Sequence, residues 1–582
     1  MGEPRIVTVP FTQAASAELS ARGGKFVNWP VVYVLDGTRE VYVGETLSAS
    51  KRLRQHVDSR SKQGVTRARV VLDETFNKSA CLDLESRLIR LFAGDGSLSV
   101  LNGNDGITDA DYYRRAEYQP AFDAVFEQLR DAGLFTRSVA EIENSDLFKL
   151  SPFKALNPEQ AIAVEDIVEG LVDDMTTGET STIVVQGEPG TGKTIVGIYL
   201  VKLLRDIASG MTIEDNDGEA MFSEFFVEDV HRLLSGMCIG LVVPQQSLRE
   251  SVRRVFAKTP ALDRAMVLSP FDVGKAARRG DEGAPPFDVL VVDEAHRLNH
   301  RANQPSGPLN AEFASINERL FGTDDNRWTQ LDWIRAQSRH QVFLVDVGQR
   351  VRPADLPVST LAKLVEDARS VRRRYSLTSQ MRVAGGGDYI AYVRQMLGDG
   401  PPPPEVPVFD GYELGLFDSF PAMLARVRER NDEDGLSRLV AGFAWPWVSR
   451  KDPEMTDIVI DGVGLPWNRT QTDWISSPSS LDEVGSIHTV QGYDLNYAGV
   501  IIGPDLRLDP RTGRIAFNRA RYFDKKGMEN NRRLGIVYSD ADMLEFVRNV
   551  YSVLLTRGMR GTFVYVCDDA LRERLSRFLP RA

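Results

Sequence analysis

The chain has 582 residues, of which 42% are hydrophobic and 26% are charged, so it has the composition of a folded protein. This length exceeds what one hydrophobic core serves, and we expect about three domains. No apolar run approaches the roughly 18 residues of a membrane span and no signal-peptide pattern is visible, which favours a cytoplasmic protein. Three scattered cysteines exclude a disulfide framework or a zinc site, and the net charge of −12 argues against a protein that coats nucleic acid through its overall charge.

The first predicted element is a β-hairpin at residues 31–46, VVYVLDGTREVYVGET. β-Branched and aromatic residues flank a turn at Asp36 and Gly37, as strand pairing requires. Tyr33 and Tyr42 lie nine positions apart across that turn. On this evidence alone, the two tyrosines are ordinary strand residues.

A basic helix follows the hairpin. Arg52 and His56 lie four residues apart on one face of this helix. The helix opens a basic patch, defined here as residues 51–69, with seven basic residues and one acid. The patch is either a solvated surface or a surface that contacts phosphates.

The next predicted helix, ACLDLESRLIRLF at residues 80–92, places an acid among apolar residues. Its apolar stripe at helical spacing consists of Cys81, Leu82, Leu88, Ile89 and Phe92. Glu85 falls inside this stripe. A carboxylate there needs a cation, because burial alone would be costly or would raise its pKa until it protonated.

From about residue 150 onward, short apolar strands alternate with helical segments. The first set of strands is TIVVQG, CIGLVVP, FDVLVVDE and HQVFLVD. A second set, DIVIDGV, AGVIIGP, RLGIVYS and GTFVYVCD, follows a proline-rich loop near residue 400. This alternation predicts parallel sheets with crossover helices, arranged as two α/β lobes in tandem.

A phosphate-binding loop is predicted at residues 187–194, GEPGTGKT, which matches G-x-x-x-x-G-K-[ST] between a strand and a helix. Glycines there let backbone N–H groups surround phosphates at a helix N-terminus. The lysine supplies a charge to the β- and γ-phosphates, and the last threonine offers a hydroxyl to Mg²⁺. The nucleotide-binding residues predicted here are Gly187, Gly190, Thr191, Gly192, Lys193 and Thr194.

Two adjacent acids, Asp293 and Glu294, end the apolar strand FDVLVVDE. We expect Asp293 to hold the Mg²⁺ ion with its water shell, and Glu294 to orient or deprotonate the attacking water. A structural acid pair is the alternative, but two buried carboxylates are costly without a cation. These motifs predict an NTPase without distinguishing a motor from a switch.

Further motifs follow in chain order: VDVGQR with Gln349, LTSQMR with Arg382, HTVQGYDLNYAGVIIG with Gln491, and VLLTRGMRGTFVYV with Arg557. With the earlier motifs, they make residues 150–582 similar to a superfamily 1 helicase. More narrowly, AGFAWPW and the last two motifs resemble the Schlafen group 3-like DNA/RNA helicase domain.

This resemblance implies roles for several residues. Gln160 would bind adenine, Gln349 would sense the γ-phosphate, and Gln491 would belong to the nucleotide site. Arg382 and Arg557 would act as catalytic fingers on the transferring phosphate, where cations stabilise transition-state charge. A single strand would cross the tops of two RecA-like lobes. Four tryptophans would then stack bases or pack the core, with at least two expected in the core: Trp445, Trp447, Trp467 and Trp474.

The hairpin region also resembles the GIY-YIG nuclease domain, through VVY, YVG nine residues on, and KRLRQH. The resemblance implies that Tyr33 assists deprotonation of the attacking water, a role that Tyr42 would share. Arg52 would steady the phosphate with His56 beside it, and Glu85 would hold one divalent metal ion. Because the first motif reads Val-Val-Tyr rather than Gly-Ile-Tyr, a binding-only domain is an alternative.

The predicted fold class is therefore α/β, with a small mixed α/β nuclease-like domain followed by two tandem RecA-like parallel-sheet lobes. The expected boundaries are 1–110 for the nuclease-like domain and 111–150 for a helical linker. The first lobe is expected at 151–370 and the second at 371–582.

The leading interpretation of function is an ATP-dependent helicase or translocase fused to a metal-dependent endonuclease. It would need ATP and Mg²⁺, with Mn²⁺ as an alternative ion at the nuclease site. Its partner would be nucleic acid, single-stranded or partly duplex DNA rather than RNA, and analogy suggests phage defence or DNA repair. Two alternatives stay open: an ATPase with an inactive N-terminal binding module, and a nucleotide-gated clamp that holds nucleic acid without moving.

Overall fold

The computed structural model describes residues 4–59, 62, 64–102, 112–153, 156–210, 222–280, 283–301, 304, 306–346, 348–380, 383–469, 474–477, 479–490 and 493–582. These residues form two compact units. The first comprises Met1–Val172, Ile198–Met237 and Val252–Met266, and the second comprises Asp173–Gly197, Cys238–Ser251 and Val267–Ala582. In the part of the chain described, no helix is long and apolar enough to cross a membrane.

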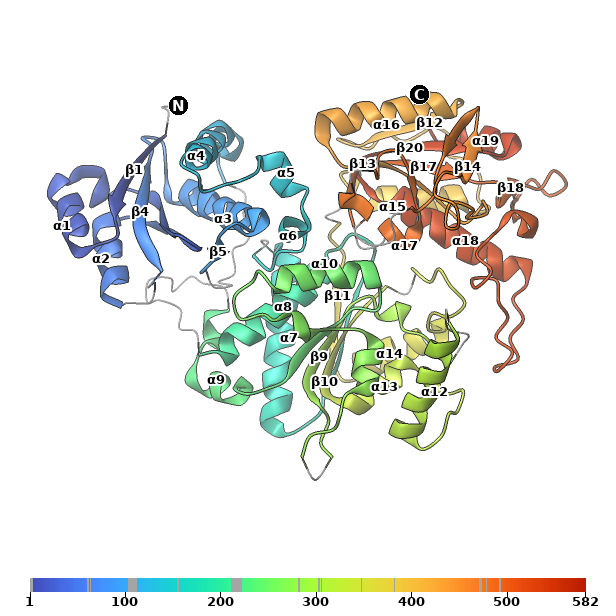
Figure 1. Ribbon diagram of the computed structural model, residues 1–582, viewed down its shortest axis with the longest axis horizontal. Helices are drawn as coiled ribbons and strands as arrows, with labels where there is room; N and C mark the ends of the chain where they lie inside the picture. The colour runs from blue at the N-terminus through green and yellow to red at the C-terminus, as the bar shows by residue number, and fades with distance from the viewer. Residues whose placement is uncertain are drawn as a thin grey trace. The chain divides into compact units, whose positions relative to one another are not determined.

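The first unit is built on a mixed sheet with the strand order β1-β4-β2-β3-β5 (Figure 1). Its strands are β1 (Arg5–Pro10), β2 (Val31–Gly37), β3 (Glu40–Thr46), β4 (Val65–Leu72) and β5 (Ser99–Val100). β2 and β3 form the predicted hairpin, in which Tyr33 pairs with Gly44 and Leu35 pairs with Tyr42. This register fixes which side chains share a face.

Helices cover both faces of this sheet. α1 (Gln13–Arg22) and α2 (Ala49–Ser59) pack over the face that holds Tyr33. α3 (Lys78–Asp95) and α4 (Gln119–Asp131) pack over the face that holds Val34 and Val43. The predicted apolar stripe of α3 is wrong at Leu82, which is 41% exposed. The shorter helices of this unit include α5 (Val139–Glu143), α6 (Asp146–Lys149) and α9 (Glu228–Leu234).

The second unit begins with a parallel sheet in the order β11-β6-β10-β9-β7-β8. Its strands are β6 (Thr182–Gly187), β7 (Ile239–Val242), β8 (Val267–Leu268), β9 (Phe287–Val292), β10 (Ser338–Val345) and β11 (Arg374–Leu377). Its own helices are α11 (Pro270–Lys275), α12 (Gly307–Phe321), α13 (Gln330–Gln337) and α14 (Val358–Ser370). The helices α7 (Pro158–Thr177), α8 (Lys193–Ala208) and α10 (Gln246–Phe256) contribute residues to both units.

A second parallel sheet follows in the order β12-β20-β17-β13-β16. Its strands are β12 (Glu413–Phe417), β13 (Ser437–Ala441), β16 (Val484–Gly485), β17 (Leu495–Ile502) and β20 (Gly558–Val566). α16 (Phe420–Asp434) covers one face, whereas α15 (Gly386–Leu397) and α18 (Asp540–Leu555) cover the other (Figure 1). α17 (Ile487–Val490) and α19 (Asp569–Leu575) complete the helices. The two predicted parallel-sheet lobes are thus present.

Two strands predicted for the second lobe do not join its parallel sheet. DIVIDGV forms the antiparallel hairpin β14 (Ile458–Ile460) and β15 (Val463–Leu465), because Asp461 and Gly462 turn with φ angles of 49° and 81°. RLGIVYS forms a turn closed by an isolated bridge between Ile536 and Asn531; Tyr538 packs against the core of this lobe, but Val537 is 74% exposed. Another antiparallel pair is β18 (Leu506–Leu508) with β19 (Ile515–Phe517).

The tryptophans of the second lobe serve mainly in packing. Trp467 and Trp474 are 4% and 1% exposed and lie in the core clusters. Trp445 and Trp447 are half-buried against one of these clusters. The expectation that at least two tryptophans belong to the core is confirmed.

Candidate functional site

The phosphate loop follows β6 and leads into α8. Gly190 and Gly192 have φ angles of 84° and 80°, a left-handed conformation that glycine adopts without steric cost. A β-carbon at Gly187 would lie 2.5 Å from Thr191 Oγ1, so this position also needs glycine. Thr191 Oγ1 donates to the carbonyl oxygen of Glu188 at 2.9 Å, which closes the loop.

Lys193 is the first residue of α8 and is buried. Its Nζ donates to the carbonyl oxygens of Gly187 (2.7 Å) and Glu188 (2.8 Å) and lies 3.9 Å from Asp346 Oδ2. The ammonium group therefore lies over its own loop. A phosphate would compete for this group, because its negative charge attracts the ammonium more strongly than a neutral carbonyl oxygen does.

Asp293 follows β9, and its Oδ2 accepts a 2.9 Å hydrogen bond from Thr194 Oγ1. Only 1% of Asp293 is exposed. Burial, reinforced by the charge of the adjacent Glu294, raises the pKa of Asp293. A carboxylate and a hydroxyl oxygen suit Mg²⁺, which takes oxygen ligands and keeps several waters, so these residues fit the predicted ion.

Glu294 is held in its ionised form by its neighbours. Its Oε2 lies 3.0 Å from His296 Nε2. Burial tends to raise the pKa of Glu294, but the contact with His296 and the positive charges of Lys193 and Arg297 outweigh burial, and the net effect lowers the pKa. A water-orienting base needs this state. The φ angle of 48° at Glu294 is unusual for a residue other than glycine, and such strain gathers at functional sites.

Asp346 and Gln349 follow the end of β10 and are buried. Among the residues that the structure describes, the side-chain oxygen of Gln349 is buried without a hydrogen-bond partner. An unsatisfied buried acceptor costs about 1–3 kcal/mol. The predicted role of Gln349 as a γ-phosphate sensor stays a prediction.

The catalytic residues predicted in the second lobe are only partly placed. Arg382 and Gln491 lie outside the described residues. Arg557 is 2% exposed, and its Nη1 donates to the carbonyl oxygen of Tyr493 at 3.2 Å. The structure thus brings Arg557 to the HTVQGYD segment, and its role as a catalytic finger stays a prediction.

Two residues that were not singled out from the sequence lie at the phosphate loop. Gln380 Nε2 donates to the carbonyl oxygen of Pro189 at 2.6 Å, and Arg394 Nη1 lies 2.7 Å from Glu188 Oε1. Gln380 belongs to the LTSQMR motif, which could have identified it. Arg394 lies on α15 beyond the recognisable motifs, so its spacing gives no signal.

Gln160 lies in the first turn of α7 and is 1% exposed. Its backbone N–H donates to Asn157 Oδ1 at 2.8 Å, and its Oε1 accepts from the Asn157 N–H at 3.1 Å. This reciprocal pair caps the helix. The predicted contact of Gln160 with adenine stays a prediction.

In the first unit, the hairpin and α2 bring the predicted nuclease residues together. Tyr33 Oη lies 2.8 Å from His56 Nε2 and accepts a 3.3 Å hydrogen bond from Arg52 Nε. The rings of Tyr33 and Tyr42 have centroids 6.1 Å apart. A β-carbon at Gly44 would lie 2.3 Å from Tyr33 Oη, so the glycine of YVG makes room for this ring.

The electrostatics of Tyr33 join these side chains to α3. Burial raises the pKa of Tyr33 far above its usual value, and the charge and hydrogen bond of Arg52 oppose that shift. The negative charge of Glu85 on α3 raises this pKa further. Glu85 is half-buried. One carboxylate with waters completing the shell is a donor set that Mg²⁺ accepts, so Glu85 fits the predicted metal ion.

Residues 180–568 match the family described as Schlafen group 3, DNA/RNA helicase domain. The match covers more than half of the chain and contains the phosphate loop, the Asp293–Glu294 pair and Arg557. The chain belongs to the Schlafen group 3 helicase family. Its helicase domain therefore comprises both parallel sheets.

Relatives of this Schlafen group 3 helicase domain add little about its activity. The uncharacterized protein YPL245W of Saccharomyces cerevisiae is 30% identical over 419 residues, which cover 68% of this chain and 83% of that protein. Similar solved structures include two coordinating Pif1 helicases at forked duplex DNA, with 10% identity, a TM-score of 0.24, and coverage of 69% of this chain and 91% of that one. The DEAD-box helicase Mss116 bound to single-stranded RNA has 10% identity, a TM-score of 0.25, and coverage of 71% and 73%. Scores this low carry no weight, so the family rests on the sequence match.

The basic patch lies outside the helicase match and is not a single solvated surface. Its buried members are Arg52, Lys62 and Arg69, and its exposed members include Lys51, Arg54 and Arg67. Arg67 and Arg69 donate to the buried carboxylate of Asp36 at 3.0 and 2.7 Å. Part of the patch therefore neutralises an internal acid.

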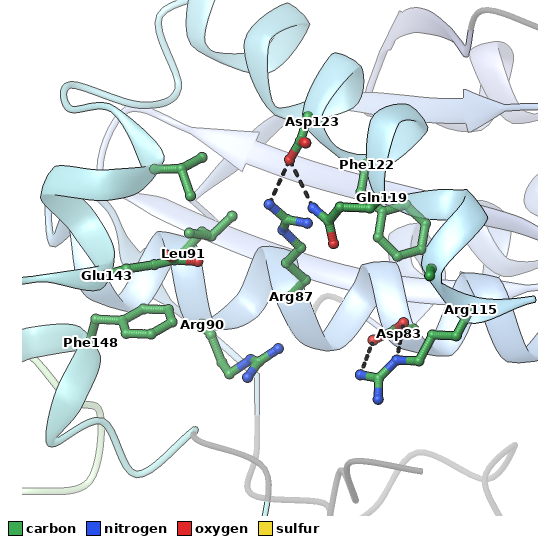
Figure 2. A pocket seen from close by; sticks show the side chains of 12 residues that line it. Asp83, Arg87, Arg90, Leu91, Arg115, Gln119, Phe122, Asp123, Glu143 and Phe148 are labelled. Atoms are coloured by element: carbon green, nitrogen blue, oxygen red, sulfur yellow. Dashed lines mark hydrogen bonds and ion pairs between the residues drawn. The ribbon is translucent and has the colours of Figure 1, made fainter. Parts of the chain in front are cut away.

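A cavity of about 690 Å³ lies in the first unit, over the side of α3 that bears Asp83 and Arg87 (Figure 2). Arg87 pairs with Asp123 at 2.7 Å, and Arg115 pairs with Asp83 at 2.9 Å. Glu85 is two residues from Asp83 and belongs to the other side of the helix. The lining also includes Arg90 and Glu143, so it holds basic and acidic side chains in equal number.

Proposed function

We propose that the chain is an ATP-driven helicase or translocase that acts on single-stranded nucleic acid. The observation that carries the proposal is the pair of contacts at the phosphate loop, Lys193 Nζ with Asp346 Oδ2 at 3.9 Å and Thr194 Oγ1 with Asp293 Oδ2 at 2.9 Å. Lys193 would hold the β- and γ-phosphates, and Glu294 would orient and deprotonate water. Thr194 and Asp293 would hold Mg²⁺, which supplies charge neutralisation at the phosphates. We take DNA as the first substrate to test, with RNA as the matched alternative.

The test is ATP hydrolysis with and without single-stranded DNA or RNA. We expect a single strand to stimulate ATP hydrolysis. A bound strand would favour the closed arrangement of the lobes, in which Arg382 and Arg557 would meet the γ-phosphate. Lys193→Ala should lower turnover by at least about 10²-fold. Lys363→Ala, an exposed lysine on α14, should leave the rate unchanged. Absence of hydrolysis with any single strand, or normal turnover in Lys193→Ala, would contradict the proposal.

We also propose that the first unit is a metal-dependent endonuclease of the GIY-YIG type. The observation that favours it is the contact of Tyr33 Oη with both Arg52 and His56. Tyr33 would assist deprotonation of water, Arg52 would steady the phosphate, and Glu85 would hold Mg²⁺ or Mn²⁺, which supplies charge stabilisation at the leaving oxygen. An inactive binding module would keep this packing without cutting, and cleavage of a labelled duplex with either ion distinguishes the two.

A further inference from the structure

Lys62 lies among the proposed nuclease residues although no motif includes it. The side chain is buried, with 8% of Lys62 exposed. Its Nζ lies 2.9 Å from Nδ1 of His56 and 3.7 Å from the centroid of the Tyr42 ring. The Tyr42 and His56 rings have centroids 5.2 Å apart, so the three side chains form one cluster. A buried ammonium group needs such partners, because its desolvation is costly.

The Lys62 contact decides where His56 carries its proton. An ammonium group has hydrogens to donate and no lone pair with which to accept. Nδ1 of His56 is therefore the acceptor, and the proton of the neutral imidazole lies on Nε2. Because Nε2 is 2.8 Å from Tyr33 Oη, the imidazole donates to the phenol oxygen.

The Tyr33 Oη atom accepts a second hydrogen bond. Arg52 Nε donates to Tyr33 Oη at 3.3 Å. The two N–H groups occupy the lone pairs of the phenol oxygen, so the hydroxyl hydrogen of Tyr33 points to another partner and not to His56. With the proton on Nδ1 instead, Nε2 would accept from Tyr33, and the direction of this hydrogen bond would reverse.

We propose that Lys62 is a positioning residue that fixes His56 in its Nε2–H tautomer, with that N–H directed at Tyr33. This inference deepens the proposed nuclease function and rests on it for its catalytic meaning. Burial favours the protonated phenol of Tyr33, and the two N–H donors oppose this effect by stabilising the negative charge that its oxygen carries after losing the proton. The deprotonated oxygen is the form that helps to deprotonate water. Lys62 thus acts on the reaction through His56.

Histidine-selective ¹⁵N labelling of the full chain reads the tautomer directly. The chain has six histidines, and the signals that vanish in His56→Gln identify this one. We expect the Nε2–H tautomer in the wild type and in Lys62→Arg, because a guanidinium also only donates. Lys62→Met removes the donor and should shift His56 toward the Nδ1–H form. Lys51→Met, an exposed lysine on α2, is the matched control and should change nothing.

Cleavage measured on the same proteins should follow the tautomer. It should fall about 10²-fold in Lys62→Met and recover in Lys62→Arg. If Lys62→Met does not fold, Lys62→Gln serves in its place, because an amide offers both a donor and an acceptor and should give a mixture of tautomers.

An Nδ1–H tautomer of His56 in the wild type would overturn the proposal. An Nε2–H tautomer that is unchanged in Lys62→Met would overturn it as well. A wild type with the Nε2–H tautomer that cuts neither DNA nor RNA would overturn the nuclease function alone, and the effect of Lys62 on His56 would stand. The two failures are therefore distinguishable.

Discussion

Asp505 is a buried acid in the second lobe whose protonation is linked to stability. Tyr551 Oη donates to Asp505 Oδ1 at 2.7 Å. Burial raises the pKa of Asp505 to about 7. An unfolded chain has an Asp pKa of about 3.9, so the folded protein binds this proton more tightly. The resulting stabilisation is fully present below about pH 4 and is lost as the pH rises toward 7.

We therefore predict that Asp505→Asn reduces the pH dependence of stability. Asparagine keeps the shape of the side chain and stays neutral at every pH. Between pH 5 and pH 8, the wild type should lose on the order of 1–3 kcal/mol of unfolding free energy that the variant keeps. Thermal unfolding at both pH values measures this difference, with the exposed Asp432→Asn as control. Equal pH dependence in the wild type and Asp505→Asn would show that this carboxyl does not titrate between folded and unfolded states.

Single residues differ in how far the sequence reveals them. Lys193 and Thr194 are predictable because a phosphate imposes a fixed spacing on the loop that holds it. Lys62 is not, because its contact with His56, six residues earlier, follows no motif and no periodic pattern in the sequence. Arg394 reaches the phosphate loop only through the packing of the lobes.

The β2–β3 hairpin positions Tyr33 through its register with Gly44. We predict that Gly44→Ala displaces the Tyr33 ring from its donors and destabilises the protein by about 1–3 kcal/mol, as overpacking does. The rate of nucleic-acid cleavage should also fall in Gly44→Ala, because Tyr33 would lose its donors. Gly307→Ala, where a β-carbon meets open space, is the control for adding one methyl group. Wild-type stability and cleavage in Gly44→Ala would show that the ring does not need this space.

Two basic side chains of helix α2, Lys51 and Arg54, are exposed to solvent, whereas Arg52 is buried. If both side chains contact phosphates, changing both to glutamate should weaken the salt dependence of nucleic-acid binding. The slope of log binding constant against log salt concentration should become less negative by about 2, since each phosphate contact contributes about 0.9 to it. The same double change at Lys363 and Arg369, exposed on α14, is the control. An unaltered slope would mean that α2 does not bind nucleic acid.

The strands show where sequence patterns succeed and where they fail. Strands such as β9 and β10 are predictable because parallel strands buried on both faces are almost continuously apolar. RLGIVYS has a short apolar centre like these strands, but in the described part of the chain it makes only an isolated bridge between Ile536 and Asn531, and an apolar run alone does not show which strand it would pair with. The Asp461–Gly462 turn that converts DIVIDGV into a hairpin is a turn signal that the strand interpretation overlooked.

The chain as a whole would combine two chemistries, ATP hydrolysis at the phosphate loop and phosphodiester cleavage in the first unit. The two can be separated by mutation, because each depends on its own carboxylate. Glu85→Gln removes the charge that would hold the nuclease metal ion, and Glu294→Gln removes the charge that would orient the hydrolytic water. Both changes keep the side-chain volume, and losing one such contact typically lowers a rate by about 10²–10³-fold.

The decisive measurement compares cleavage of labelled DNA and release of phosphate from ATP, with Mg²⁺ present, in the wild type and these two variants. Glu85→Gln should hydrolyse ATP at the wild-type rate and cut at least about 10²-fold more slowly. Glu294→Gln should lose hydrolysis and keep its ATP-independent cutting. A Glu85→Gln protein that cuts as fast as the wild type would contradict the nuclease assignment, and the tyrosines would then be ordinary residues of the hairpin.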